Sequence, residues 1–221
     1  MTGSVIANIA DYADALLTTR KARNILVLLL LVMLFFQLAL FFTVRYKIQI
    51  APGGPAESVA PTTSVVHQTS PALIDFLKYL TGLVDFAGVI VPFVLAVDLW
   101  LIVSIMLMGR LLGVSRLVSA FLWCVVLIAL LFPWQAFLNN QTFTSTEFKV
   151  PGVLYTWTEL AVRGRIHPAG IRPSILYWAR FVGWPIVAIL IVLMIQHLSG
   201  LGLRLAMGKN PSTPPSPAVE S

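Results

Sequence analysis

Four long apolar stretches dominate the pattern of hydrophobic and polar positions along this chain. A helix that crosses a bilayer needs about 20 consecutive, mostly apolar residues. The stretches that meet this length are residues 25–44, 83–108, 117–138 and 175–199. The second and fourth contain Pro92 and Pro185, so a tilt or a bend is expected there, and Pro133 lies near the end of the third. The pattern predicts an all-α integral membrane protein, folded as a four-transmembrane-helix bundle.

The first 24 residues carry the spacing of an amphipathic helix. Between residues 4 and 18, apolar side chains recur at helical intervals, opposite Asn8, Asp11 and Asp14. Such a helix can lie in the membrane interface or pack on the protein's own cytoplasmic surface. Packing on the protein is favoured, because helices that bind anionic lipid carry Lys and Arg on their polar face. The long apolar core that follows predicts an uncleaved signal anchor.

The orientation is predicted from where basic residues cluster, because their totals on the two sides are nearly equal. The residues that decide it precede the first span or lie in the short loop 109–116: Arg20, Lys21, Arg23, Arg110 and Arg116. Short loops rich in Lys and Arg stay in the cytoplasm. Both termini are therefore expected to be cytoplasmic, in the plasma (inner) membrane. Residues 45–82 and 139–174 become outer loops, and residues 200–221 a disordered cytoplasmic tail.

The outer loops contain two stretches that resemble short strands. Residues 44–50 alternate with period two, and residues 147–150 follow a Thr-rich run. They could pair into a small outer β-cap, or they could be two unrelated extended segments, and the sequence leaves both possibilities open. Residues 153–163 have the pattern of an interfacial helix that would place Tyr155 and Trp157 at headgroup level.

Composition and residue types exclude several classes of function. Only 11% of residues are charged, whereas soluble domains carry roughly 25%. The net charge is +6, but no basic run indicates nucleic-acid binding. The single cysteine, Cys124, cannot form a disulfide within the chain and is expected to be a small buried residue. The scattered histidines predict no metal or haem site, so no cofactor is expected.

Ionisable residues inside a span are costly and raise a functional hypothesis. Asp98 lies about 18 Å from Arg110 along its helix, which places it near mid-membrane. Gln37 lies at a similar depth in the first span, about 21 Å from Arg23. Asp98 is therefore predicted to face the bundle interior and to contact Gln37. A hydrogen-bonded tie between helices is favoured over a proton or cation site, because few polar groups lie between Asp98 and either surface.

A second pair of intramembrane polar residues is predicted near the outer interface. Asp85 lies about 37 Å above Arg110, and Arg180 about 36 Å above Arg204. At matched depth, Asp85 and Arg180 could form an ion pair that joins the second and fourth spans. Each side chain could equally extend into the headgroups without pairing.

These features favour a non-enzymatic structural or accessory subunit of a membrane assembly. The expected partners are the lipid bilayer and other membrane proteins or a second copy, with no nucleic acid. A small transporter or channel subunit with Asp98 in its path is the alternative. A membrane enzyme that uses Glu147, Glu159 or His167 is least favoured, because these residues are dispersed along the sequence.

Overall fold

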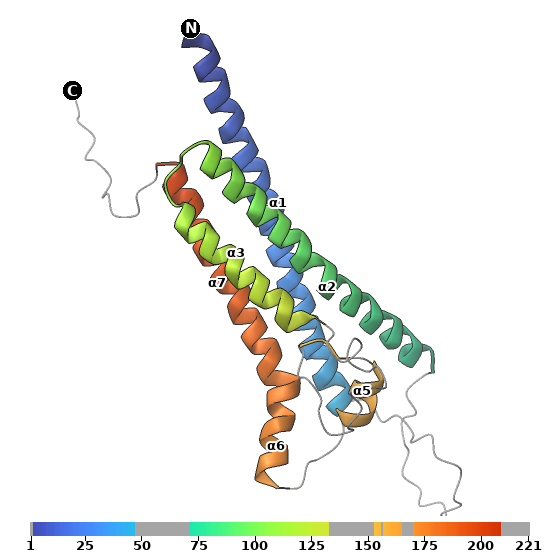
Figure 1. The fold of residues 1–221 in the computed structure, drawn as a ribbon. Helices are drawn as coiled ribbons and strands as arrows, with labels where there is room; N and C mark the ends of the chain where they lie inside the picture. The colour runs from blue at the N-terminus through green and yellow to red at the C-terminus, as the bar shows by residue number, and fades with distance from the viewer. Residues whose placement is uncertain (1, 47–70, 133–152, 156, 165–169, 209–221) are drawn as a thin grey trace, which may run out of the picture. The chain divides into compact units, whose positions relative to one another are not determined.

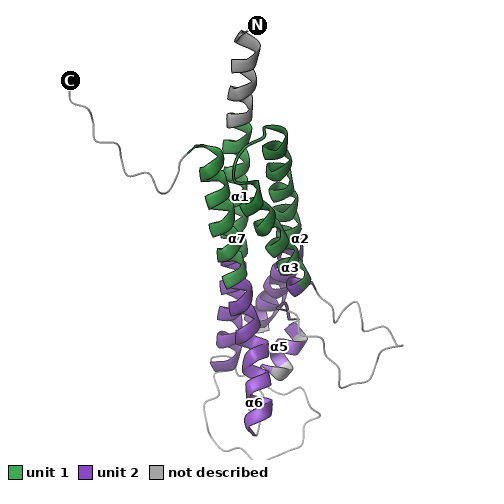
Figure 2. Cartoon of the chain, turned by 60° about the vertical axis from the view of Figure 1, so that its left-hand side comes forward, with its two compact units in different colours: residues 1–30, 91–129, 190–221 green, residues 31–90, 130–189 purple. Residues whose placement is uncertain are grey.

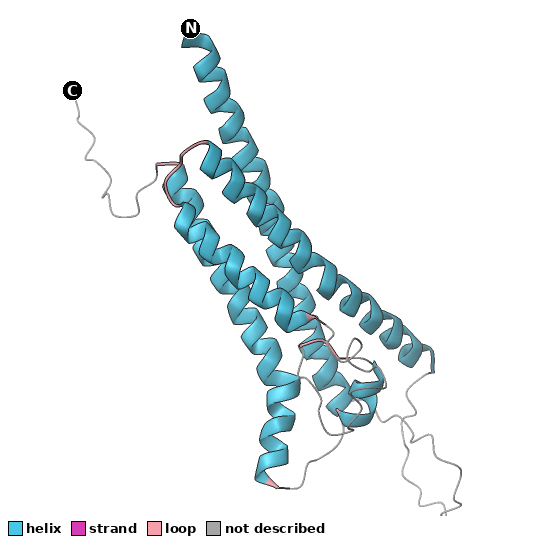
Figure 3. Ribbon diagram, viewed as in Figure 1, coloured by secondary structure: helices cyan, strands magenta, loops and turns pink. Residues whose placement is uncertain are grey.

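A computed structural model describes residues 2–46, 71–132, 153–155, 157–164 and 170–208. These residues are helical nearly throughout, and no strand occurs among them (Figure 3). Four of the described helical segments are long and apolar enough to cross a membrane: Asp14–Tyr46, Ala72–Met108, Val114–Leu131 and Ile171–Ala206. The predicted all-α, four-helix membrane bundle is confirmed (Figure 1).

The first helix, α1, runs without a break over Thr2–Tyr46. No glycine or proline occurs between residues 4 and 46, so nothing interrupts its backbone hydrogen bonds. The helix predicted over residues 4–18 is confirmed, but the expected boundary near residue 24 is absent. Because the segment continues straight into the first span, the backbone offers no break at which it could turn into the membrane plane.

The predicted β-cap falls mostly outside the described residues. Its first strand was expected over residues 44–50, but residues 44–46 form the last turn of α1. The strand assignment is wrong for those three residues, because the helix formed by the preceding apolar run continues through them. The rest of that stretch, together with residues 147–150, lies outside the described residues.

Helix α2 spans Pro71–Met108, beginning twelve residues before the expected start of the second span and ending where expected. Pro71 suits the first helical position, where its missing amide hydrogen would have no partner. At the other end, the Leu111 amide donates to the Met106 carbonyl at 2.9 Å, and the Arg110 amide donates to the Leu107 carbonyl at 3.2 Å. This is a Schellman ending, in which Arg110 takes the left-handed conformation, with φ of 51°, that usually favours glycine.

Helix α3 spans Val114–Leu131, so it is shorter than the predicted third span, which ended at residue 138. Pro133 accounts for the early end, because proline disfavours helical backbone at the residue before it. The Leu130 carbonyl near this end accepts a hydrogen bond at 3.1 Å from the Val153 amide. Carbonyls in the last turn of a helix have no partner within the helix, so Val153 supplies one from a distant segment.

The fourth span combines α6 (Ile171–Trp178), a π-helical turn η1 (Ala179–Gly183) and α7 (Trp184–Ala206). Pro185 is the second residue of α7, and in a regular α-helix its ring would clash with the carbonyl four residues earlier, that of Phe181 in η1. The wider π turn gives that carbonyl room. The bend predicted at Pro185 is therefore built as a π turn.

The chain divides into two compact units (Figure 2). Unit 1 comprises residues 1–30, 91–129 and 190–221, and unit 2 comprises residues 31–90 and 130–189. The core of unit 1 contains Leu16, Ile102, Val103, Met106, Leu117 and Leu203. The core of unit 2 contains Leu40, Phe41, Val44, Tyr155, Leu160 and Phe181. Unit 2 also holds the short helix α5 (Trp157–Arg163).

Candidate functional site

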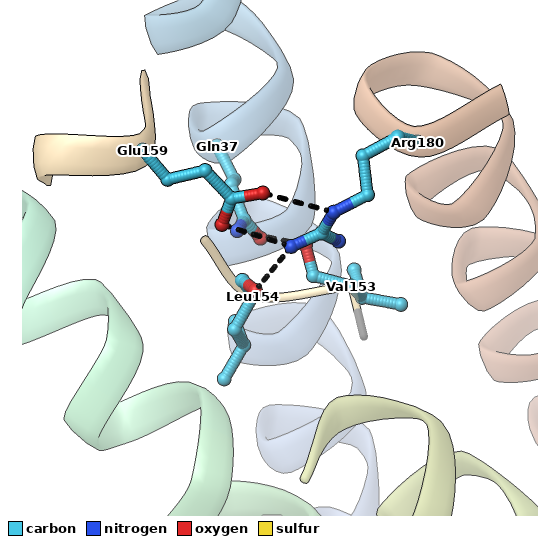
Figure 4. A network of polar contacts seen from close by, with 5 residues as sticks. All are labelled: Gln37, Val153, Leu154, Glu159 and Arg180. Carbon is cyan, nitrogen blue, oxygen red and sulfur yellow. Dashed lines mark hydrogen bonds and ion pairs between the residues drawn. The ribbon is translucent and has the colours of Figure 1, made fainter. Parts of the chain in front are cut away.

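A short non-helical segment, residues 153–155, lies buried in unit 2. Val153 is 0% exposed and Tyr155 is 1% exposed. The Gln37 side-chain amide donates to the Val153 carbonyl at 3.1 Å (Figure 4). Together with the bond from the Val153 amide to Leu130, this satisfies both backbone groups of Val153. Non-helical backbone is tolerated in such an apolar setting only when its polar groups are paired in this way.

Arg180 in η1 holds the next part of this segment. Its Nε donates to Glu159 Oε1 at 3.2 Å, and its Nη2 donates to Glu159 Oε2 at 3.1 Å (Figure 4). Nη2 also donates to the Leu154 carbonyl at 3.2 Å. The two side chains are mostly buried. A two-bond pairing of guanidinium and carboxylate fixes orientation as well as charge, so Arg180 ties the fourth span to both α5 and the buried segment.

Tyr155 closes this network from the other side. Its hydroxyl donates to the Gln37 carbonyl, and its ring meets that of Phe181 edge to face with 5.6 Å between centroids. Burial raises the pKa of the Tyr155 phenol, and the nearby charge of Asp85 raises it further. Tyr155 is therefore buried within the unit, with its hydroxyl bonded to backbone, and its predicted position at headgroup level stays a prediction. The helix predicted over residues 153–163 is confirmed only from Trp157 onward.

The predicted ion pair between Asp85 and Arg180 is replaced by the pair between Arg180 and Glu159. Asp85 does lie in the same cluster, since its carboxylate and that of Glu159 are close enough to repel each other. Both predicted residues therefore interact with Glu159, Arg180 as its ion-pair partner and Asp85 as a like charge. The partner was missed because a loop helix, whose depth cannot be counted from a span end, contributes the carboxylate.

Arg45 lies in an aromatic cluster of unit 2. Its guanidinium carbon is 5.0 Å from the ring centroids of both Tyr177 and Trp178, and its Nη1 donates to the Tyr177 hydroxyl. The Tyr177 hydroxyl in turn donates to the Gly164 carbonyl, just beyond the end of α5. Cation–π contacts of this kind stabilise a guanidinium away from bulk water, so Arg45 joins the end of α1 to α6.

Unit 1 contains a separate pair of buried charges, Arg23 on α1 and Asp98 on α2. Arg23 is 2% exposed and Asp98 is 8% exposed, and their opposite charges interact. Arg23 Nη2 donates to the Asn24 side-chain oxygen at 2.9 Å, and Gln196 on α7 donates to the same oxygen at 3.2 Å. Within the described residues, Arg23 Nε, Arg23 Nη1 and Asp98 Oδ2 make no hydrogen bond. The cluster therefore draws on three helices of the unit.

The prediction that Asp98 faces the interior is confirmed by its burial. Its predicted partner, Gln37, belongs to unit 2, where its amide hydrogen bonds to Val153. Two residues at equal depth on two helices need not point toward each other, because depth does not fix the rotation of a helix. The group that Gln37 does bind is the buried backbone carbonyl of Val153, which cannot be found by counting residues along the spans. The charged neighbour of Asp98 is Arg23, which the sequence places among the flanking basic residues.

Two residues of these clusters could have been found from sequence signals. Arg23 precedes the buried residues Val27 and Leu30 by four and seven positions, which puts it on the buried face of α1. Glu159 lies in the predicted interfacial helix, where a carboxylate among apolar residues signals a buried partner. The backbone carbonyls of Val153 and Leu154 leave no trace in the sequence.

The remaining candidate residues are the single cysteine and the side chains that could bind a metal ion. Cys124 is buried, as expected, and its thiol donates to the Pro92 carbonyl with 3.5 Å between sulfur and oxygen. No group of three or more His, Cys, Asp or Glu residues that could hold a metal ion occurs in the described part of the chain. The chemistry that the described clusters support is the pairing of charges and the anchoring of backbone.

Comparisons with known proteins give no family for this chain. A scan against protein-family models, a search of the curated proteins and a search of the solved structures each found no match. The function is therefore argued from the contacts described above.

Proposed function

We propose that this multi-pass membrane protein is a non-enzymatic structural or accessory subunit of a membrane assembly. The observation that supports this most strongly is the use of Arg180, which is bonded to both carboxylate oxygens of Glu159 and to the Leu154 carbonyl. A guanidinium held by three hydrogen bonds within the chain is suited to fixing geometry. Two other side chains also hold backbone in place. The Gln37 side-chain amide donates to the Val153 carbonyl, and the Tyr155 hydroxyl donates to the Gln37 carbonyl.

In this proposal, unit 2 is a rigid surface for presentation to partners. The segment 153–155 and α5 are held by side chains from α1 and η1, so their arrangement depends on contacts between distant parts of the sequence. Preorganised surfaces bind partners with a smaller loss of conformational entropy. An accessory subunit gains from such rigidity, because its role is to hold other chains in place.

We further propose that both termini are cytoplasmic and that the protein resides in the plasma (inner) membrane. The basic cluster before the first span and the short loop after α2 support this orientation. Single cysteines placed in a Cys124→Ala background at residues 58 and 213 test it with a membrane-impermeant maleimide in intact cells. Labelling at residue 58 alone is expected, and labelling at residue 213 alone would reverse the topology.

The accessory role is tested by purification of the tagged chain from its native host in a mild detergent, with quantification of every co-purifying chain. A partner at fixed stoichiometry is expected, and it should be reduced in an Arg180→Ala variant that still inserts. An Arg172→Ala variant, which removes an exposed arginine of α6, serves as the matched control. Purification of the chain without any stoichiometric partner would overturn the proposal.

A transporter or channel subunit is the second candidate, and the Arg23–Asp98 cluster supports it. Both side chains are buried charges with polar atoms that no described residue engages. Intramembrane ionisable residues of this kind commonly mark ion or substrate pathways. Reconstituted vesicles with wild-type protein and with Asp98→Asn distinguish the candidates. Proton or cation flux that is lost in the variant without loss of assembly supports transport, whereas no flux in either supports the accessory role.

A further inference from the structure

Unit 1 exposes polar side chains where α1 and α7 meet. Gln196 on α7 donates to the Asn24 side-chain oxygen on α1 at 3.2 Å, so these two residues mark the junction of the helices. Asn24 is exposed, and so are Lys21, one turn before it on α1, and His197, the next residue of α7 after Gln196. We call Lys21, Asn24, Gln196 and His197 the α1–α7 face.

The α1–α7 face lies at a depth that lipid tails occupy. Helix α3 extends about 27 Å over its 18 residues, so it needs its whole length to cross a hydrocarbon core of about 30 Å. Gly113, just before α3, lies against Gly202 of α7, whose carbonyl oxygen is 2.7 Å from where a Gly113 Cβ would be. Gln196 precedes Gly202 by six residues, which places it about 9 Å inside the hydrocarbon. Asn24, bonded to Gln196, lies at the same depth.

The faces of α2 and α3 in this unit differ from the α1–α7 face. The exposed residues of α2 from 93 to 101 and of α3 from 118 to 129 are all apolar. Lipid tails are as apolar as these side chains, so lipid alone can cover them. Polar groups that face lipid cost free energy, and only the α1–α7 face requires something other than lipid tails.

The lipid headgroups can relieve only part of this cost. Lys21 lies one turn closer to the membrane surface than Asn24, and its long side chain can reach the headgroups. The short side chain of Asn24 has no such reach. Its oxygen already accepts hydrogen bonds from Arg23 and Gln196, whereas its nitrogen has no acceptor within the described residues. The acceptor therefore has to come from outside the unit.

The free groups on the α1–α7 face are suited to a carboxylate. Lys21 and the Asn24 nitrogen offer only donors, and His197 can donate from a ring nitrogen. No ion pair involves Lys21 in the described part of the chain. A carboxylate accepts several hydrogen bonds at once and neutralises the lysine charge. Asp or Glu on a neighbouring transmembrane helix supplies this group at the depth of Asn24.

A second copy of this chain suits the α1–α7 face less well. Two parallel copies related by a twofold axis through this face bring each Lys21 toward its counterpart, so like charges oppose each other. The exposed carboxylate on the same side of α1, Asp14, lies seven residues from Lys21, about 10 Å along the helix. Asp98 is buried within unit 1. The chain therefore offers its own copy no carboxylate at this depth within the described residues.

We propose that the α1–α7 face is a docking site for a transmembrane helix of another protein, which carries Asp or Glu at the depth of Asn24. Gly200 lies one turn from Gln196, and a Cβ there would meet nothing within 4 Å, so a helix can approach closely. This contact rests on the accessory role and adds a binding face on unit 1 to the surface that unit 2 presents.

Photo-cross-linking in membranes of the native host tests this proposal. A benzophenone amino acid replaces one exposed apolar residue at a time: Leu28 and Leu193 beside the face, Val97 on α2 and Leu122 on α3. An adduct with one other membrane protein is expected from the first two positions, at least fivefold above the last two. Peptide mapping should place it on a transmembrane helix with Asp or Glu at the depth of Asn24. Adducts only with lipid, only with a second copy, equally from all positions, or with a helix that lacks a carboxylate would overturn the proposal.

Co-purification of the cross-linked protein gives a second measurement. Lys21→Gln combined with Asn24→Leu should reduce its recovery at least tenfold, because the donors to the carboxylate are lost. The matched control, Ser115→Leu with Arg116→Gln, makes similar changes at exposed positions of α3 and should retain the partner. Unchanged recovery in the first variant contradicts the proposal. Should that variant fail to fold, the cross-linking still decides, because its positions are exposed and apolar.

A fifth position separates this proposal from the accessory role. Leu176, an exposed residue of α6 in unit 2, receives the same photoreactive amino acid. A stoichiometric partner that cross-links only from Leu176 would leave the accessory role intact and overturn the contact on the α1–α7 face. The absence of any stoichiometric partner would overturn both.

Discussion

Arg180 and Glu159 form a two-bond ion pair that connects the π turn of the fourth span to α5, across 21 residues of sequence. The Leu154 carbonyl shares the same guanidinium, so a single side chain positions both α5 and the buried segment before it. Arginine suits this role because its planar fork offers several donors and keeps its charge when buried. The stability of unit 2 should therefore depend strongly on this contact.

Replacing Glu159 with Gln should destabilise the protein by about 2–4 kcal/mol, because it leaves a mostly buried guanidinium without a counter-charge. Thermal unfolding in a fixed detergent measures the effect. The double variant Glu159→Gln with Arg180→Met should lose less than the sum of the two single variants. Strict additivity of the single effects would show that the pair contributes nothing. Asp75→Asn, an exposed carboxylate of α2, is the control and should stay within about 0.5 kcal/mol of wild type.

Tyr155→Phe removes the hydrogen bond to the Gln37 carbonyl and should cost about 1 kcal/mol near pH 8. The raised pKa of the folded phenol gives this difference a defined pH dependence. Below the unfolded pKa, about 10, both states hold the proton and the full difference is present. As the pH rises above that value, the unfolded wild type loses its proton more readily than the folded protein, so the advantage over Tyr155→Phe shrinks.

Chemical unfolding of both proteins from pH 8 to pH 11 measures this change. Tyr79→Phe, at an 80% exposed position, controls for the loss of a hydroxyl in water and should show no such trend. A constant difference between wild type and Tyr155→Phe across the range would contradict the burial of a protonated phenol.

Gly113→Ala should destabilise unit 1 by about 1–3 kcal/mol. Gly113 has φ of 95°, which a side chain disfavours, and an added Cβ would lie 2.7 Å from the Gly202 carbonyl oxygen. That oxygen is backbone and cannot easily move. Gly200→Ala is the control, because its Cβ would meet nothing within 4 Å and alanine favours the helix. Opposite signs are expected in thermal unfolding, and equal effects would show that the turn geometry is unimportant.

Asp98→Leu should destabilise the folded protein more than Arg23→Leu does. Arginine cannot lose its charge, so removal of Asp98 leaves a buried cation at a cost of about 3–5 kcal/mol. Removal of Arg23 is milder, because the carboxyl group left behind can take up a proton. The double variant should be more stable than Asp98→Leu. Thermal unfolding and the yield of folded protein measure the order, and a double variant no more stable than Asp98→Leu would show that the two charges do not depend on each other.

Much of the architecture follows from the sequence. A run of about 20 apolar residues must adopt a helix in a membrane, because every backbone polar group has to be satisfied locally. The four spans were predictable for this reason. Their ends were less predictable, since α2 begins twelve residues early and α3 ends at Leu131, where Pro133 limits it. The burial of Asp98 was also predictable, because a charge in a span avoids lipid.

The sequence by itself determined the class of the protein, its four helices and the interior position of Asp98, because these depend on local composition and on the cost of polar groups in lipid. The tertiary structure alone decided the partners. Glu159 pairs with Arg180, Gln37 binds the Val153 carbonyl, and Arg23 accompanies Asp98. These choices depend on how each helix is rotated and on where a loop passes, and neither property is encoded in the spacing along one helix.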